Sequence, residues 1–192
     1  MSEYSTYRLD CGHVHVVCVQ SKTDECGEAC AGMVIAMSKA RFVDLATLRA
    51  TSQAVGGAEY RPSPKDAGAK VTDRRQAGLA AVLMAGKGSE AGTGAANLVN
   101  ILKNFGVAST LHRSGAAVKI KDAAASGKPV IAGVSWPQGG GHFIVVHGTS
   151  NKKYCILDPG HEGVVNTTPV GSISYITPYG LTGEFDEAIV LT

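Results

Sequence analysis

The chain lacks a hydrophobic run of transmembrane length, and its first eight residues contain no apolar signal region. It also has little net charge, because 18 Lys and Arg stand against 16 Asp and Glu and leave a formal balance of +2. This balance argues against nucleic acid or an anionic membrane surface as the main partner. We therefore expect a soluble protein without a membrane segment. It would act in the cytosol, either of its own cell or of a recipient cell that it reaches by a route without a cleavable signal.

A paired-cysteine framework is also missing. The five cysteines, at positions 11, 18, 26, 30 and 155, are an odd number, so at least one thiol is unpaired. With 192 residues and a hydrophobic fraction of 44%, the chain can build a sizeable core and does not need disulfides to fold. Whether Cys11, Cys18 or Cys155 form a disulfide stays open at this point.

Cofactor and metal signals are weak. The glycine-rich segment 86–94 contains Gly-Lys but not the pattern of a phosphate-binding loop. The alternation in Cys11-Gly-His13-Val-His15 puts three ligand-type side chains on one face of a strand. No second pair of ligands with metal-site spacing follows, so we interpret this face as an exposed strand surface and predict neither a metal nor a cofactor.

The order of the expected elements indicates an α+β fold. Helical patterns dominate the first half and strand patterns the second, which favours a single domain over 1–192 with a helical lobe (about 1–106), a β lobe (about 107–192) and a cleft between them. The sequence gives the weakest structural signals over residues 42–93, and the role of this segment stays open. Expected strands are 13–20, 107–112, 130–136, 142–147, 153–157 and 188–191, and expected helices are 26–39, 42–54, 75–85, 95–105 and 120–126.

The segment from Gln20 to Cys30 carries the clearest chemical signal. Cys26 opens the expected helix 26–39, where the helix dipole and unpaired backbone N–H groups favour a thiolate, the reactive form of a cysteine. Gln20, six residues upstream, would donate to the oxyanion that forms when this thiolate attacks a carbonyl. Cys30 lies one turn further inside the helix, where the dipole has faded, so we predict that Cys26 is the nucleophile.

A histidine and an aspartate complete the pattern far downstream. His142 begins one expected strand and Asp158 follows the next, so a hairpin between them would bring the two side chains together. In that position the aspartate would orient the imidazole and fix its tautomer. Gly140 and Gly141, just before the histidine, would let a substrate backbone approach closely. Trp136 either forms a wall of the substrate cleft or belongs to the core.

Two of these segments resemble a known family. Gln20 through Met37, with Asp-Glu-Cys-Gly-Glu-Ala-Cys-Ala-Gly-Met, resembles the active-site entry of C39-type peptidases, papain-like enzymes that cut leader peptides after a double glycine. Gly-His142-Phe-Ile-Val-Val and Leu-Asp158-Pro are similar to the histidine and aspartate segments of that family. The resemblance implies a papain-like fold, a nucleophile at Cys26, an oxyanion glutamine at Gln20 and a structural role for Cys30. The distance from Cys26 to His142 is longer than is usual there, and no transporter follows in the sequence.

These observations predict a cysteine endopeptidase that cuts a protein or peptide substrate, with a preference for glycine before the cut. A free-standing chain without a signal favours a delivered interbacterial toxin or effector protease, which would need an immunity protein that covers the cleft. Leader-peptide processing in a peptide export system is the alternative role. The same residues would also serve acyl transfer or deamidation, as in a transglutaminase, and a catalytically idle peptide-binding domain is the non-enzymatic alternative.

Overall fold

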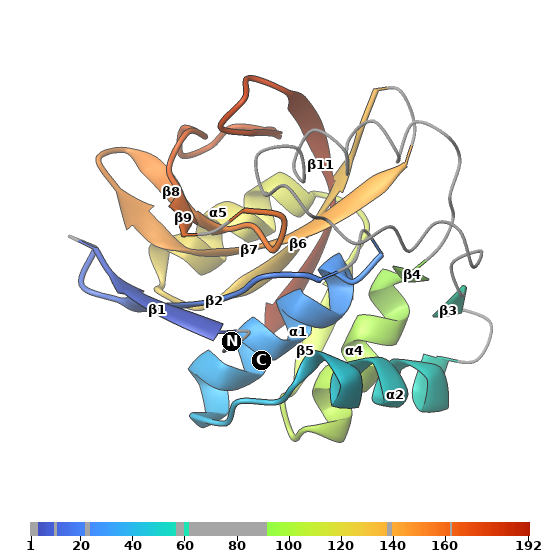
Figure 1. The fold of residues 1–192 in the computed structure, drawn as a ribbon. Helices are drawn as coiled ribbons and strands as arrows, with labels where there is room; N and C mark the ends of the chain where they lie inside the picture. The colour runs from blue at the N-terminus through green and yellow to red at the C-terminus, as the bar shows by residue number, and fades with distance from the viewer. Residues whose placement is uncertain are drawn as a thin grey trace.

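The computed structural model describes residues 4–9, 11–21, 24–56, 60–61, 92–137, 140–161 and 163–192. Its central feature is a seven-stranded sheet in which every neighbouring pair is antiparallel (Figure 1). The order is β10-β11-β6-β7-β8-β9, and β5 also pairs with β11. The strands are β5 (Ser109–His112), β6 (Val130–Ser135), β7 (Gly141–Ser150), β8 (Lys153–Leu157), β9 (Val164–Val165), β10 (Ser174–Ile176) and β11 (Thr182–Leu191).

Helices lie on both faces of this sheet (Figure 1). The first layer contains α1 (Cys26–Lys39), α2 (Leu45–Gly56) and α4 (Ala95–Asn104), and α1 packs directly against β7. The opposite face is covered by α5 (Ala116–Ala125). Two small hairpins complete the described elements: β1 (Tyr4–Arg8) pairs with β2 (Val14–Cys18), and β3 (Tyr60–Arg61) pairs with β4 (Gly92–Thr93).

The alternation of side chains along the strands separates two cores. On the α1 face, Ile131, Val145 and Leu157 join the first core, and on the α5 face Ala132, Val146 and Ile156 join the second. Because both faces are covered, the central strands are apolar at nearly every position rather than at every second one. The sheet therefore packs against the helices on both of its faces. Its packing against α1 fixes where this helix begins relative to β7.

The α+β class and the packing of the nucleophile helix on an antiparallel sheet are confirmed. Helix 26–39 and strand 153–157 have the expected bounds. The helix expected over 42–54 begins at Leu45, the one over 120–126 begins at Ala116, and the strand expected at 188–191 begins at Thr182. The helix expected over 75–85 lies outside the described residues. Among the described residues, no helix combines the length and the apolar character needed to cross a bilayer.

Polar groups hold the entry of α1 against its neighbours. Arg49 on α2 forms ion pairs with Asp24 and Glu25, at 3.2 and 3.0 Å, immediately before the helix. Beneath them, the buried Asn97 amide donates to the hydroxyls of Ser52 and Thr93, at 2.9 and 2.6 Å. These contacts join α2, β4 and α4. The start of α1 is thus anchored from the helical layer as well as from the sheet.

Glu28, in the first turn of α1, is almost fully buried. Burial raises the pKa of its carboxyl above the ordinary 4.5, while the hydrogen bonds from its own backbone N–H and from Ser52 oppose this shift. A raised pKa means that its contribution to stability is complete below the unfolded-state value and is lost as the pH rises through the folded-state value.

We therefore expect Glu28→Gln to melt at a higher temperature than the wild type at neutral and alkaline pH. The gain should shrink as the pH falls below the ordinary value of 4.5, where the wild-type carboxyl becomes protonated in both states. Thermal unfolding followed by circular dichroism between pH 4 and pH 9 measures this. A gain that does not change with pH would contradict a buried ionisable carboxylate as the cause.

Candidate active site

Cys26 is the first residue of α1, and its side chain is half-buried. The preceding residue, Glu25, provides no side-chain cap, so the backbone N–H groups of the first turn point towards the space around the thiol. Cys30, one turn later, is completely buried, and burial raises the pKa of its thiol well above the ordinary value. Of the two thiols in this helix, Cys26 is the accessible one at the positive end of the dipole.

Close packing fixes this end of the helix. A Cβ added to Gly27 would lie 2.5 Å from Thr93 Cγ2 and 3.6 Å from the ring of Phe143. The residue after the thiol therefore lies close to the residue after His142. Only glycine fits at position 27 without displacing Thr93, which explains the Cys-Gly pair at the helix start.

The imidazole of His142 and the carboxylate of Asp158 meet on the sheet. His142 Nε2 lies 2.8 Å from Asp158 Oδ1, and both side chains are buried. Strands β7 and β8, joined by a tight turn with Asn151 and Lys152 at positive φ, place the pair side by side. The hairpin geometry expected from the sequence is what the structure has.

The electrostatics of this pair favour an imidazolium. Burial alone lowers the pKa of His142, but the charge of Asp158 and hydrogen bonds to Asp158 and Cys26 outweigh it and raise the pKa to about 10. Burial tends to raise the pKa of Asp158, whereas His142 and two further hydrogen bonds lower it. The arrangement can therefore hold a positive imidazolium beside the Cys26 thiol at neutral pH.

Two supports of Asp158 were not apparent from the sequence. The hydroxyl of Tyr175, on β10, donates to Asp158 Oδ2 at 2.7 Å, and the backbone N–H of Gly160 donates to Oδ1 at 2.8 Å. Tyr175 is fully buried, and its pKa is raised well above the ordinary value by burial and by the neighbouring carboxylate. No local pattern marks this tyrosine, because its role depends on the pairing of β10 with β11.

Gln20 lies next to the aspartate turn. Its backbone N–H donates to the carbonyl of Pro159 at 2.9 Å. A Cβ added to Gly160 would lie 3.2 Å from Asp158 Oδ1 and 4.0 Å from Gln20 Oε1. The segment that follows β2 is therefore held against the loop that follows β8, and the Gln20 side chain is on the Asp158 side of that loop.

The three residues predicted to bind substrate have different environments. Gly140 and Gly141 are exposed at the start of β7, and the Gly140 carbonyl accepts a hydrogen bond from the backbone of Trp136. Trp136 itself is 6% exposed and belongs to the core on the α5 face. Its ring is stacked near that of His142, with the centroids 6.3 Å apart. Of the two interpretations of Trp136, the structure favours the core residue.

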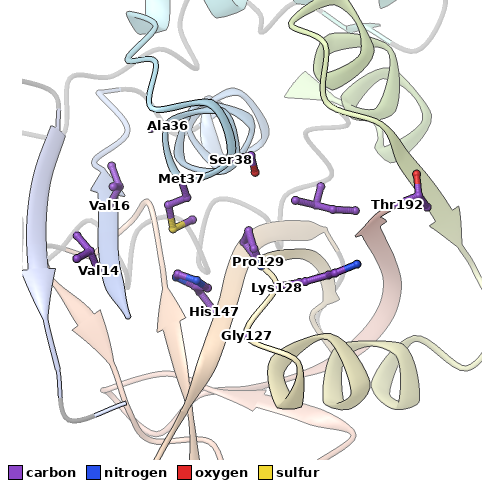
Figure 2. Close-up of a pocket in the computed structure, with 11 residues that line it drawn as sticks. Val14, Val16, Ala36, Met37, Ser38, Gly127, Lys128, Pro129, His147 and Thr192 are labelled. Carbon is purple, nitrogen blue, oxygen red and sulfur yellow. The ribbon is translucent and has the colours of Figure 1, made fainter. Parts of the chain in front are cut away.

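A pocket lies at the far end of α1 from Cys26. Met37 and Ser38 from α1, Val14 and Val16 from β2, and His147 from β7 line it (Figure 2). The remaining lining residues are Ala36, Gly127, Lys128, Pro129, Leu191 and Thr192. The pocket is separate from the Cys26 end of the helix, so it plays no part in the chemistry considered above.

The interpretation of the Cys11–His15 face as an exposed strand surface is wrong. His15 is completely buried, and its Nε2 lies 2.9 Å from the Sγ of Cys11. Cys155, on β8, joins them, and the three ligand atoms lie within 4.8 Å of one another. Cys155 lies 140 residues after His15 in the sequence, so the spacing of ligand-type residues could not have identified it. All five cysteines are free thiols in the structure.

The Peptidase C39 family model matches residues 75–168, a range that includes His142 and Asp158 and begins after Cys26. No curated protein matches the chain. Among solved structures, the peptidase domain of Streptococcus ComA, a bifunctional ABC transporter involved in a quorum-sensing pathway, is 20% identical. The match covers 94% of this chain and 98% of that domain, with a TM-score of 0.57.

Two other structures are similar over most of the chain. A double-glycine motif protease from an AMS/PCAT transporter, in complex with its leader peptide, is 20% identical over 91% of this chain and 89% of its own, with a TM-score of 0.51. A C39-like peptidase from Bacillus anthracis is 11% identical over 90% of both chains, with a TM-score of 0.55. At these identities the likeness concerns the fold, which is that of C39 peptidase domains.

The geometry around His142 predicts unequal reactivity among the thiols. The thiolate is the form of a cysteine that reacts with iodoacetamide, and a neighbouring imidazolium favours that form. We expect iodoacetamide at pH 6 to label Cys26 before the buried Cys18, Cys30 and Cys155. His142→Ala should slow this labelling by about tenfold or more, and time-resolved peptide mass spectrometry measures it. The matched control is His112→Ala, on β5; equal slowing by both variants would rule out the pairing.

Proposed function

We propose that this chain acts as a C39-type papain-like cysteine peptidase, in which Cys26, His142 and Asp158 form the catalytic triad and Gln20 is an oxyanion donor. The observation that carries the proposal is the buried His142–Asp158 pair at 2.8 Å, with Cys26 near enough to His142 to raise its pKa. The three side chains stand in the order that nucleophilic acyl transfer needs: nucleophile, base, and the group that orients the base.

The reaction proceeds in two halves. His142 takes the proton of the Cys26 thiol, and the thiolate attacks the scissile carbonyl carbon. The oxygen of the scissile carbonyl becomes negatively charged, and the Gln20 side-chain amide and the backbone N–H of Cys26 stabilise this charge. His142 then gives its proton to the leaving amine, and the C–N bond breaks to leave a thioester. Water, deprotonated by His142, hydrolyses the thioester and restores the thiol.

Asp158 holds the imidazole in position throughout this cycle. Its Oδ1 accepts from His142 Nε2, which leaves the other ring nitrogen for Cys26. The carboxylate remains ionised because Tyr175 and Gly160 also donate to it. A negative charge fixed in this way stabilises the imidazolium that forms at each step.

We propose that the substrate is a protein or peptide cut after a glycine pair. The similarity to a double-glycine motif protease bound to a leader peptide supports this preference. The exposed backbone at Gly140 and Gly141, which has no side chains, supports close approach of an extended substrate. Such a cut would serve one of two roles. The first is the processing of a leader peptide, and the second is attack on a target protein by a delivered toxin whose producer carries an immunity protein. The two roles share the chemistry and differ in the substrate.

The first experiment compares the wild type with Cys26→Ala on a synthetic leader peptide that contains Gly-Gly. We expect the wild type to produce one new amino terminus directly after the glycine pair, and Cys26→Ala to lose at least about 1,000-fold in kcat/KM because the nucleophile is absent. Mass spectrometry of the products identifies the cut. Cys30→Ala is the matched control, since it removes a buried thiol from the same helix and should retain activity within a few-fold.

Expression of the same proteins in bacteria separates the two roles. Toxicity that disappears in Cys26→Ala, with new termini in one or two cellular proteins, identifies a toxin. Cleavage of the leader peptide without toxicity identifies a processing enzyme. Ammonia release from glutamine without new termini would replace peptide hydrolysis by deamidation or acyl transfer. Full activity of Cys26→Ala would overturn the site assignment.

Tyr175→Phe tests the support of Asp158. Loss of the hydrogen bond to the carboxylate should lower kcat about tenfold with little change in KM, since such a bond to a charged group contributes about 1.5–3 kcal/mol. It should also move the alkaline limb of the kcat/KM profile to higher pH, because a carboxylate that loses a donor is a stronger hydrogen-bond acceptor for the imidazolium and raises the pKa of His142. The control is Tyr179→Phe, at a neighbouring exposed tyrosine. A drop in melting temperature without a shifted limb would assign Tyr175 a structural role only.

A further inference from the structure

Three metal-ligand side chains meet between the N-terminal hairpin and the sheet. Cys11 lies in the turn between β1 and β2, His15 lies on β2, and Cys155 lies on β8. Their ligand atoms are all within 4.8 Å of one another, and Cys11 Sγ is 2.9 Å from His15 Nε2. None of the three takes part in the proposed peptidase chemistry, so their convergence needs another explanation.

Burial distinguishes this cluster from a chance surface grouping. His15 and Cys155 have no exposed area, and Cys11 is half-buried. The second ring nitrogen of His15, Nδ1, is buried without a hydrogen-bond partner. A fully buried imidazole normally satisfies both nitrogens, because an unpaired buried polar atom costs about 1–3 kcal/mol. The cluster is therefore polar, enclosed and incompletely satisfied.

We propose that Cys11, His15 and Cys155 bind one Zn²⁺ ion. Two thiolates and one imidazole are the donor set that zinc prefers, and three protein ligands leave the fourth tetrahedral position to water. On binding, each cysteine loses its thiol proton to solvent and each sulfur forms a bond to the metal. Two negative sulfurs balance the double positive charge, so the enclosed complex has no net charge.

The geometry requires only a small adjustment. With Zn–N near 2.0 Å and Zn–S near 2.3 Å, a tetrahedral centre separates neighbouring N and S ligands by about 3.5 Å. The present separation of 2.9 Å must therefore widen by about half an ångström. Cys11 can make this movement, since it lies in a turn of a hairpin whose two strands pair with each other and not with the seven-stranded sheet.

Two further histidines surround the site. The ring of His147 lies 5.1 Å from that of His15 and 4.9 Å from that of His13, measured between centroids. His147 sits at the bulge of β7 that faces Cys155 on β8. Figure 2 shows its ring at the wall of the pocket beneath Met37, so this pocket brings solvent to the histidine side of the cluster.

A metal here would join elements that lead into the catalytic residues. His15 precedes Gln20 on the same segment, and Cys155 precedes Asp158. We therefore expect a zinc ion that ties the N-terminal hairpin to β8. The inference does not depend on the proposed peptidase function, because metal binding is measured without turnover.

The test uses Co²⁺ as the probe, added to reduced, metal-free Cys26→Ala protein, in which the active-site thiol is absent. We expect one Co²⁺ per chain, with thiolate-to-cobalt charge-transfer absorption and the visible bands of a tetrahedral centre. Zn²⁺ should remove these bands, and saturation with Zn²⁺ should raise the melting temperature by several degrees. Cys11→Ser and Cys155→Ala, made in the same background, should each weaken binding by about 100-fold or more.

Cys18→Ala in the same background is the matched control, because it removes a buried thiol from β2 outside the cluster and should leave the cobalt spectrum unchanged. Circular dichroism verifies that each variant is folded. Cobalt binding that survives both Cys11→Ser and Cys155→Ala would overturn the proposal. So would a reduced, folded protein without charge-transfer absorption.

Discussion

The hydrogen bond between His142 and Asp158 is the contact around which the described active-site geometry is organised. Two ionisable side chains are removed from water here, and the cost of burying them is offset only if each is paired and its remaining polar atoms are satisfied. The second carboxylate oxygen is therefore bound by Tyr175, and the first also by the backbone of Gly160. This requirement connects β7, β8 and β10, although their residues are far apart in sequence.

The thiol reaches this pair from a different layer of the fold. Cys26 is positioned by the packing of α1 on β7, and the absence of a side chain at Gly27 lets the helix start approach Thr93 and Phe143 closely. Arg49 holds the acidic residues before the helix from the other side. The proposed nucleophile lies on one layer and the proposed base on the other, which explains why the helix start needs anchoring from both.

Local signals in the sequence predict the secondary structure around Cys26, His142 and Asp158 well and the supporting residues poorly. The apolar run after Cys26 gives α1 its observed bounds, and the turn before Lys153 gives the hairpin that joins His142 to Asp158. By contrast, Tyr175 stands on a three-residue strand with no periodicity of its own. The burial of His15 depends on Cys155 from a distant strand. The role of Tyr175 and the burial of His15 both depend on contacts between segments that are remote in sequence. The spacing of residues in a single sequence does not reveal such contacts.

The segment that carries Gln20, the proposed oxyanion donor, follows a hairpin that lies outside the seven-stranded sheet. The β1–β2 hairpin before it pairs only with itself among the described strands, while β2 packs on α1 and the backbone N–H of Gln20 donates to the carbonyl of Pro159. An oxyanion donor must be positioned to within a fraction of an ångström to act in the transition state. Since β2 and β8 run from the Cys11–His15–Cys155 cluster to Gln20 and Asp158, a bond that ties the two strands at the cluster restricts their relative movement at the catalytic end as well. The same two strands thus connect the proposed zinc cluster to the proposed triad.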